Sequence, residues 1–295
     1  MLPEIALDGR LFNPEQLEFF GKVNFLKGGV AWSDAVSTVS RGYAQEIQTK
    51  ELGFGLDTFL RKHGPITGIL NGVDYSQWNP ETDKHLERNY SSGDLSGKRE
   101  CKRALLAEFG LPAGSLDRPI IGMVSRLTDQ KGFDLIADVA NSLMDQDITL
   151  IVLGSGDPKY EKMLRLLEEF HRDKVGALIG YDEALAHRIV AGADMFLVPS
   201  RYEPSGLTQM YSLSYGTVPV VRATGGLDEA IDEQTGFKFR DYSGVALLST
   251  VQAALAAYRD QSRWTAMMRR GMQRDFSWNA SAAKYLALYK RILES

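Results

Sequence analysis

The chain has 295 residues, of which 44% are hydrophobic and 24% are charged, and these are ordinary values for a globular protein. A net charge of −4, with basic and acidic residues interspersed, argues against nucleic-acid binding through a basic surface. The single cysteine, Cys101, excludes an internal disulfide, and no apolar stretch approaches the roughly 20 residues of a membrane span. We therefore expect a protein of the cytoplasm or of a plastid stroma that binds neither nucleic acid nor membrane.

The first 65 residues contain few regular elements. Glu15 to Val30 is compatible with a helix, Ala35 to Val39 is predicted to be a strand, and a helix is expected from Gly42 to Thr49. A single β-α unit is too small to be a domain, and its exposed strand edge would need a partner. The polar composition from Tyr75 to Ser96 indicates a long surface excursion.

Strand-like and helix-like segments alternate from about residue 116 onwards. Continuous apolar strands separated by amphipathic helices predict a parallel sheet covered on both faces, which is a doubly wound α/β domain. Beyond it, helices alone are expected from Val245 to Ser295. The expected strands are 119–124, 148–153, 175–179, 194–198, 218–221 and 237–239, and the expected helices are 133–144, 160–170 and 183–191, with others starting near 206 and 227.

Ligands of such sheets bind beyond the carboxyl ends of the strands, so the loops that lead from strand to helix are the candidate site. The loop from Ser125 to Gly132 carries Arg126 and Lys131 ahead of a helix. Two fixed cations, together with the free N–H groups of a helix N-terminus, suit a diphosphate. The alternative is a solvated loop that happens to carry two surface cations.

A second loop, from Pro199 to Gln209, places the carboxylate of Glu203 between a strand and a helix. A carboxylate there can bind sugar hydroxyls or respond to developing positive charge. Gly206 would let a ligand approach the backbone, and the N–H groups of Leu207 and Thr208 would then face a phosphate. The alternative is that Glu203 and Thr208 only help to cap the helix.

The third loop, from Thr224 to Leu227, is rich in glycine. Gly225 and Gly226 allow a tight turn and a helix N-terminus that faces an anion, and a plain strand-to-helix turn is an equally compatible interpretation. Tyr181 follows a strand and could either stack on a base or simply pack. The sequence contains no P-loop, and its dinucleotide fingerprint is incomplete. Its four histidines lack metal-ligand spacing, so no metal site is expected.

Long motifs in these loops carry a resemblance to a known family. They are Ser125-Arg-Leu-Thr-Asp-Gln-Lys-Gly132, Pro199-Ser-Arg-Tyr-Glu-Pro-Ser-Gly-Leu-Thr-Gln209, and Tyr215-Gly-Thr-Val-Pro-Val-Val221 followed by Thr224-Gly-Gly-Leu227. With them the chain resembles bacterial glycogen synthases and plant starch synthases over nearly its whole length. That family has a GT-B-type fold of two facing Rossmann-like domains. It transfers glucose from ADP-glucose to the non-reducing end of an α-1,4-glucan, retains the anomeric configuration, releases ADP and needs no metal or cofactor.

The resemblance implies roles for single residues. Arg126 and Lys131 would hold the diphosphate and stabilise the departing ADP, and Glu203 would be the functional carboxylate near the sugar. Tyr211 stands where related transferases often carry a second Glu, which favours an α-glucan synthase. The other residues expected at the nucleotide sugar are Ser125, Tyr181, Ser205 (where many members carry Cys), Gly206, Leu207, Thr208, Gly225 and Gly226.

The resemblance also divides the chain. Residues 1–65 would be the tail of an N-terminal, acceptor-side domain, residues 66–275 the nucleotide-sugar-binding domain, and residues 276–295 a C-terminal helix. The donor-binding Lys-x-Gly-Gly-Leu loop and the His-Asp residues of the family's N-terminal domain are not in this sequence. Three hypotheses therefore stay open: a glucosyltransferase, an ADP- or ADP-glucose-binding module without activity alone, and a subunit that a separate N-terminal chain or self-association completes.

Overall fold

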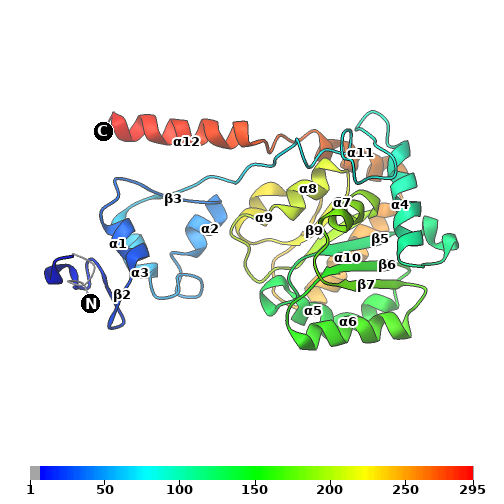
Figure 1. Cartoon of the computed structure of the whole chain (residues 1–295), viewed down its shortest axis with the longest axis horizontal. Coiled ribbons are helices and arrows are strands. Elements are labelled where there is room, and N and C mark those ends of the chain that lie inside the picture. The colour runs from blue at the N-terminus through cyan, green and yellow to red at the C-terminus, as the bar shows by residue number, and fades with distance from the viewer. Residues whose placement is uncertain (1–6, 295) are drawn as a thin grey trace.

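The computed structural model describes residues 7–294, and its largest part is a parallel sheet. Six strands lie in the order β10-β9-β8-β5-β6-β7, and every neighbouring pair is parallel. Figure 1 shows β5, β6 and β7 side by side. The predicted strands are thereby confirmed, including the short last one. They are β5 (Ile120–Val124), β6 (Thr149–Gly154), β7 (Val175–Ile179), β8 (Met195–Val198), β9 (Val218–Arg222) and β10 (Phe237–Phe239).

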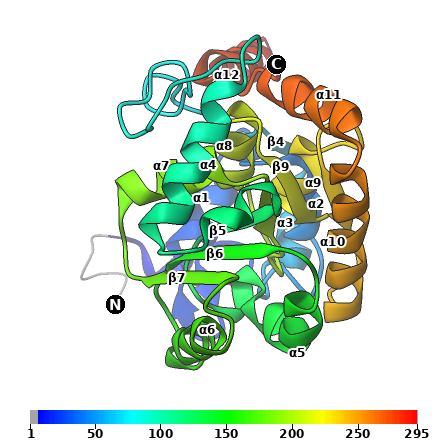
Figure 2. The same cartoon turned by 90° about the vertical axis from the view of Figure 1, so that its right-hand side faces the viewer.

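Helices cover both faces of the sheet, because alternate residues of each strand point to opposite sides (Figure 2). Ile121 and Met123 of β5 join one buried cluster, whereas Ile120 joins the other. The doubly wound α/β prediction is confirmed. One cluster contains side chains of α5 (Phe133–Met144), α6 (Pro158–Phe170), α10 (Gly244–Tyr258) and α11 (Gln261–Met272), and the other those of α4 (Ser96–Glu108), α7 (Glu183–Gly192), α8 (Thr208–Ser214) and α9 (Gly225–Ala230).

The predicted helix from Glu15 to Val30 is wrong over most of its length. Strands β1 (Glu18–Phe19) and β2 (Lys22–Val23) form a small antiparallel hairpin there, preceded by the 3-10 turn η2 (Gly9–Leu11). The turn between them needs positive φ, 50° at Phe20 and 76° at Gly21, and such φ angles end a right-handed helix. Only α1 (Phe25–Ala31) is helical, with Asn24 as its N-cap.

The predicted strand near residues 35–39 finds its partner within the chain. Strand β3 (Val36–Thr38) pairs in parallel with β4 (Ile66–Gly68). Between them lie α2 (Arg41–Glu46), which is shorter than predicted, and α3 (Asp57–His63). Residues 7–68 are here called the N-terminal unit, and Figure 1 shows it beside the larger sheet domain.

The polar residues 75–95, here called the strap, contain no helix or strand within the described chain, as predicted, but they are not a solvated excursion. Asp83 is only 5% exposed, and its carboxylate accepts a hydrogen bond from the Tyr215 hydroxyl (2.6 Å) and contacts the His187 ring (2.7 Å). The Trp78 indole stacks on His187 and on Tyr211, with ring centroids 3.7 and 3.9 Å apart. A buried polar network therefore fixes the strap to α7 and α8.

The last helix, α12 (Trp278–Leu293), runs back along the N-terminal unit (Figure 1). The Ser281 hydroxyl donates to the carbonyl oxygen of Leu70 (2.7 Å), and the Arg291 guanidinium donates to Thr67 (3.3 Å). The expected helices of the C-terminal region are confirmed up to Leu293, and Ser295 lies outside the described residues. Two further 3-10 turns, η3 (Ala113–Asp117) and η4 (Asp129–Lys131), complete the elements of residues 7–294. No helix among the described residues is long and apolar enough to cross a membrane.

Candidate active site

The strand order reverses between β5 and β8, and this reversal places the candidate site. From β5 the chain winds towards β7, and from β8 it winds the other way towards β10. The connections that leave the carboxyl ends of two such strands separate and open a crevice, where ligands of α/β sheets bind. The loop after β5 is residues 125–132 and the loop after β8 is residues 199–207, so the first two predicted loops flank this crevice.

The two loops touch each other directly. The Arg201 N–H donates to the Gln130 carbonyl (2.8 Å). A side chain on Gly132, whose φ is 79°, would lie 2.2 Å from the Pro199 carbonyl oxygen, so only glycine fits there. On the other side, the Asp129 carboxylate accepts hydrogen bonds from Lys159 and Tyr160, and these bonds lower the pKa of Asp129. The first loop is therefore fixed on both flanks.

Lys131 and Glu203 form an ion pair across the crevice. The Lys131 Nζ lies 2.5 Å from Glu203 Oε2, and the Ser200 hydroxyl donates to the same oxygen at 2.9 Å. Glu203 is 7% exposed, and a buried carboxylate of this kind is costly unless it is paired and hydrogen-bonded. The structure thus brings together two of the three residues predicted to be catalytic.

Arg126, the third residue predicted to be catalytic, lines a pocket between the ends of β5, β6 and β7. The pocket has a volume of about 260 Å³ and is lined by Ser125, Arg126 and Tyr181 together with Gly154, Ser155 and Gly180. The Arg126 guanidinium donates to Gln130 (3.1 Å), and the Tyr181 side chain is 87% exposed. Three predicted nucleotide contacts, Ser125, Arg126 and Tyr181, therefore share one pocket, and the exposed Tyr181 ring is available for stacking.

The start of α8 carries several unpaired polar groups. Within residues 7–294, the N–H groups of Leu207 and Thr208 donate to no acceptor, and the Ser205 Oγ and Gln209 Oε1 atoms are buried without a partner. Gly206 has φ of 66°, and a side chain there would meet Gln209 Oε1 at 2.4 Å. The predicted residues of this loop thus present unused donors next to Glu203, as an anion site requires.

Unlike the N–H groups of Leu207 and Thr208, those of Gly225 and Gly226 already donate hydrogen bonds within the protein. Gly225 donates to Glu46 Oε1 (2.8 Å) and Gly226 to the Glu203 carbonyl (3.0 Å). A Cβ atom would lie 2.0 Å from the Glu203 carbonyl oxygen at Gly225, and 1.9 Å from that of Ser205 at Gly226. Close packing of the two loops therefore requires both glycines, and their contact with a nucleotide stays a prediction.

Sequence reasoning missed two residues of the N-terminal unit that contact these loops, Ser40 and Glu46. The Ser40 hydroxyl donates to the Pro204 carbonyl (2.6 Å), and Glu46 accepts from the third loop. Ser40 precedes a helix and could have been recognised as its N-cap. Its partner lies 164 residues away, and no periodic pattern predicts such a contact.

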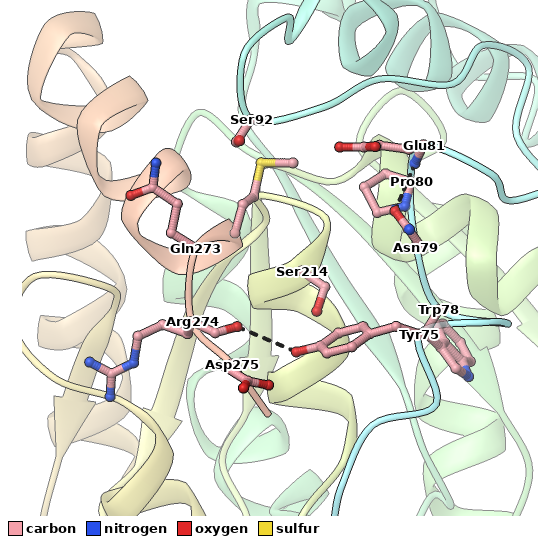
Figure 3. A pocket seen from close by; sticks show the side chains of 11 residues that line it. Tyr75, Trp78, Asn79, Pro80, Glu81, Ser92, Ser214, Gln273, Arg274 and Asp275 are labelled. Carbon is pink, nitrogen blue, oxygen red and sulfur yellow. Dashed lines mark hydrogen bonds between the residues drawn. The ribbon is translucent and has the colours of Figure 1, made fainter. Parts of the chain in front are cut away.

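A larger pocket, of about 360 Å³, lies at the far end of α8, between the strap and the segment that joins α11 to α12 (Figure 3). The Tyr75 hydroxyl accepts from the Phe276 N–H (3.0 Å) and contacts the Arg274 carbonyl (3.4 Å) at its edge. None of the predicted site residues lines it. Among the residues that the structure describes, no group of three or more His, Cys, Asp or Glu side chains could hold a metal ion.

Two protein-family models match different parts of the chain. The model "Glycosyl transferases group 1" matches residues 112–270, which include all three loops, and the model "Starch synthase catalytic domain" matches residues 1–62. The chain belongs to the glycosyl transferases group 1. Both matches agree with the resemblance drawn from the motifs, which is thereby confirmed.

Relatives of this chain include glycogen synthases. The chain is 51% identical to that of Koribacter versatilis over 299 aligned residues, which cover 99% of this chain and 61% of the relative. It is 47% identical to that of Moorella thermoacetica, with 100% of this chain and 62% of the relative covered. The chain thus spans about three fifths of the length of these relatives.

Solved structures confirm the GT-B-type fold. The catalytic domain of starch synthase IV from Arabidopsis thaliana, bound to ADP and acarbose, superposes with a TM-score of 0.91 at 35% identity and covers 100% of this chain and 64% of that one. Sucrose-phosphate synthase from Thermosynechococcus elongatus superposes with a TM-score of 0.60 at 25% identity, with 89% of this chain and 59% of that chain covered.

Proposed function

We propose that the chain carries the donor half of a retaining glucosyltransferase that transfers glucose from ADP-glucose to the non-reducing end of an α-1,4-glucan, as a glycogen or starch synthase. The observation that carries the proposal is the Lys131–Glu203 pair at the strand-order reversal, with Arg126 in the same loop as Lys131. The names of the relatives support the reaction, and the ADP in the starch synthase structure supports the nucleotide. The cytoplasm or a plastid stroma is the compartment that we propose.

The chemistry follows from where the charges lie. Negative charge grows on the diphosphate as the bond to the sugar breaks, and preorganised cations and N–H groups at that place stabilise the transition state. In the proposal, Arg126 and Lys131 supply the cations, and Leu207 and Thr208 supply the backbone N–H groups. Glu203 accepts hydrogen bonds from sugar hydroxyls. This scheme uses the chain's own residues and no metal or cofactor.

The test is transfer of labelled glucose from ADP-glucose to glycogen by the purified chain, with ADP binding measured by calorimetry in parallel. Incorporation of label together with ADP binding supports the proposal. A folded chain that binds neither ADP nor ADP-glucose contradicts it. Competition between ADP and UDP in the same calorimetric titration decides the nucleotide preference, for which ADP is expected.

A second candidate is a donor-binding module that is inactive alone or is completed by a separate N-terminal chain. The observation that favours it is the set of exposed apolar side chains on the N-terminal unit, among them Phe20, Phe25 and Leu26. Exposed apolar surface of this kind marks a contact face. ADP binding without glucose transfer supports this candidate, and transfer that appears only on mixing with a separately produced N-terminal domain of a glycogen synthase supports completion by a second chain.

A further inference from the structure

Helix α2 of the N-terminal unit lies against α9, which begins within the third loop (Figures 1 and 2). The approach is backbone to backbone, because a side chain on Gly42 would lie 2.7 Å from the Gly225 carbonyl oxygen. An ion pair between the exposed Arg41 and the largely buried Glu229, with Nε and Oε1 3.2 Å apart, borders the contact. The N-terminal unit is thus in direct contact with the candidate site.

Ser40 ties this helix to the loop that carries Glu203. Its side chain is fully buried, accepts from the Tyr43 N–H at 3.0 Å and donates to the Pro204 carbonyl at 2.6 Å. Pro204 directly follows Glu203, so the hydroxyl fixes the backbone next to the buried carboxylate. A buried hydroxyl with both its donor and its acceptor capacity in use defines one geometry.

Glu46 ties the same helix to the third loop. Its Oε1 accepts from the Thr224 hydroxyl (2.7 Å) and from the Gly225 N–H (2.8 Å). Thr224 does not cap α9 with its own side chain, so the cap comes from the N-terminal unit. A carboxylate at a helix N-terminus is favourable, and it takes the place that a bound anion would otherwise occupy.

We propose that Ser40 and Glu46 are positioning residues that hold the Glu203 loop in its binding geometry from outside the sheet domain. Glu46 holds residues 224–225 in place through its carboxylate. The neighbouring Gly226 N–H then donates to the Glu203 carbonyl, and the Ser40 hydroxyl donates to the Pro204 carbonyl. Because Glu46 already occupies the start of α9, a donor diphosphate is left to Arg126, Lys131 and the N–H groups of Leu207 and Thr208. This last consequence rests on the proposed function, whereas the positioning itself does not.

Hydrogen exchange followed by mass spectrometry tests the positioning without any ligand. In Glu46→Ala, peptides that cover residues 201–209 and 223–230 should exchange about tenfold faster, the effect of losing hydrogen bonds to a charged group. Glu46→Gln keeps an acceptor oxygen and should restore nearly normal exchange. Gln45→Ala, on an exposed neighbour in α2, is the matched control and should leave both peptides unchanged. Unchanged exchange in Glu46→Ala overturns the proposal.

Ser40→Ala and ADP binding complete the test. Of the two peptides, Ser40→Ala should accelerate exchange chiefly in residues 201–209. It replaces Glu46→Ala as the deciding variant if that protein does not fold, and unchanged exchange in residues 201–209 overturns the proposal. In calorimetry, Glu46→Ala should bind ADP about tenfold more weakly, with normal affinity in Glu46→Gln and Gln45→Ala. Wild-type protein that fails to bind ADP contradicts the proposed function only, because the exchange data still decide the positioning.

Discussion

At the scale of single residues, the site depends on a buried ion pair that a ligand has to rearrange. Lys131 has two oppositely charged partners in the proposed reaction, Glu203 in this structure and the donor diphosphate. The side chains of Lys131 and Glu203 are 19% and 10% exposed, so water screens their interaction weakly. If Lys131 turned towards a phosphate, the hydrogen bond from Ser200 would be the remaining one to the buried Glu203 carboxylate within residues 7–294. A sugar hydroxyl on Glu203 would then replace the lost partner.

Lys131→Ala should weaken ADP binding far more than Ser205→Cys. A charge-assisted hydrogen bond contributes about 1.5–3 kcal/mol, so the loss of Lys131 should lower ADP affinity by about tenfold or more. Ser205→Cys is nearly isosteric at a buried Oγ that has no partner among residues 7–294, and should change affinity by less than about twofold. Calorimetric titration measures both.

Lys162→Ala is the control for this pair of variants, because Lys162 is an exposed lysine on α6, and its ADP affinity should be unchanged. Lys131→Ala also leaves Glu203 without its cation, so circular dichroism has to show that the variant is folded. Equal affinities of the Lys131 and Ser205 variants would contradict the placement of the diphosphate at Lys131.

At the scale of elements, the sequence predicts what local periodicity encodes. The apolar strands, such as Thr149–Gly154, are buried on both faces and stand out as continuous hydrophobic runs. The segment 15–30 has apolar residues at helical spacing, yet the left-handed turn at Phe20 and Gly21 divides it. The strap is polar and still packs inward, because Asp83 finds its partners on α7 and α8, and a single sequence cannot show such distant pairing.

Gly226→Ala should disrupt the contact between the second and third loops. Its Cβ would lie 1.9 Å from the Ser205 carbonyl oxygen, which has to move, and overpacking of this kind costs about 1–3 kcal/mol. We expect a lower free energy of unfolding in urea and at least about tenfold weaker ADP binding, because the displaced backbone carries the N–H groups next to Glu203.

The matched control is Gly29→Ala in α1, where an added Cβ meets nothing within 4 Å. Alanine is favoured over glycine inside a helix by about 0.5–1 kcal/mol, so this variant should be slightly more stable and bind ADP normally. If Gly226→Ala keeps both the stability and the ADP affinity of the wild type, the close contact of the loops is not required.

Asp83→Asn should destabilise the strap in a pH-dependent way. Burial alone would raise the pKa of Asp83, but hydrogen bonds from His187 and Tyr215 outweigh burial and leave the pKa lowered. Because the pKa of Asp83 is lower in the folded than in the unfolded state, its ionised carboxylate stabilises the fold. This stabilisation is fully present above the unfolded-state pKa of about 3.9 and is lost as the pH falls through the lower folded-state pKa. Urea unfolding should therefore show a constant deficit in Asp83→Asn between pH 7 and about pH 5, which shrinks below about pH 4.

The exposed carboxylate Glu87 lies in the same strap, and Glu87→Gln serves as the control, with stability equal to wild type at each pH. A deficit in Asp83→Asn that is the same at every pH would mean that packing, rather than the charge of Asp83, holds the strap. Asp83 also accepts from the His85 N–H, so Tyr215→Phe removes one of three hydrogen bonds and should reproduce part of the deficit at neutral pH.

At the scale of the whole molecule, apolar side chains are unevenly exposed. Many of the exposed large ones lie in the N-terminal unit and on α12, which are joined by the hydrogen bond from Arg291 to Thr67. They are Phe12, Phe20, Phe25, Leu26, Trp32 and Phe54 in the unit and Trp278, Leu286, Tyr289 and Leu293 on the helix. The sequence predicts that this unit needs a contact face, and these exposed apolar side chains are the candidates for it.

The purified chain should therefore self-associate through α1 of the N-terminal unit. Phe25 and Leu26 are 63% and 69% exposed and adjacent in α1, and burying two such side chains contributes about 1.5–3 kcal/mol each. Light scattering coupled to size exclusion should show a mass that rises with protein concentration in the wild type and falls towards 32.8 kDa in the double variant Phe25→Ser, Leu26→Ser.

The control is Leu166→Ser, Phe170→Ser on α6, whose side chains are 41% and 76% exposed and belong to the sheet domain. It should associate like the wild type. A wild-type monomer at high concentration, or equal masses for the two double variants, would contradict a contact face on α1.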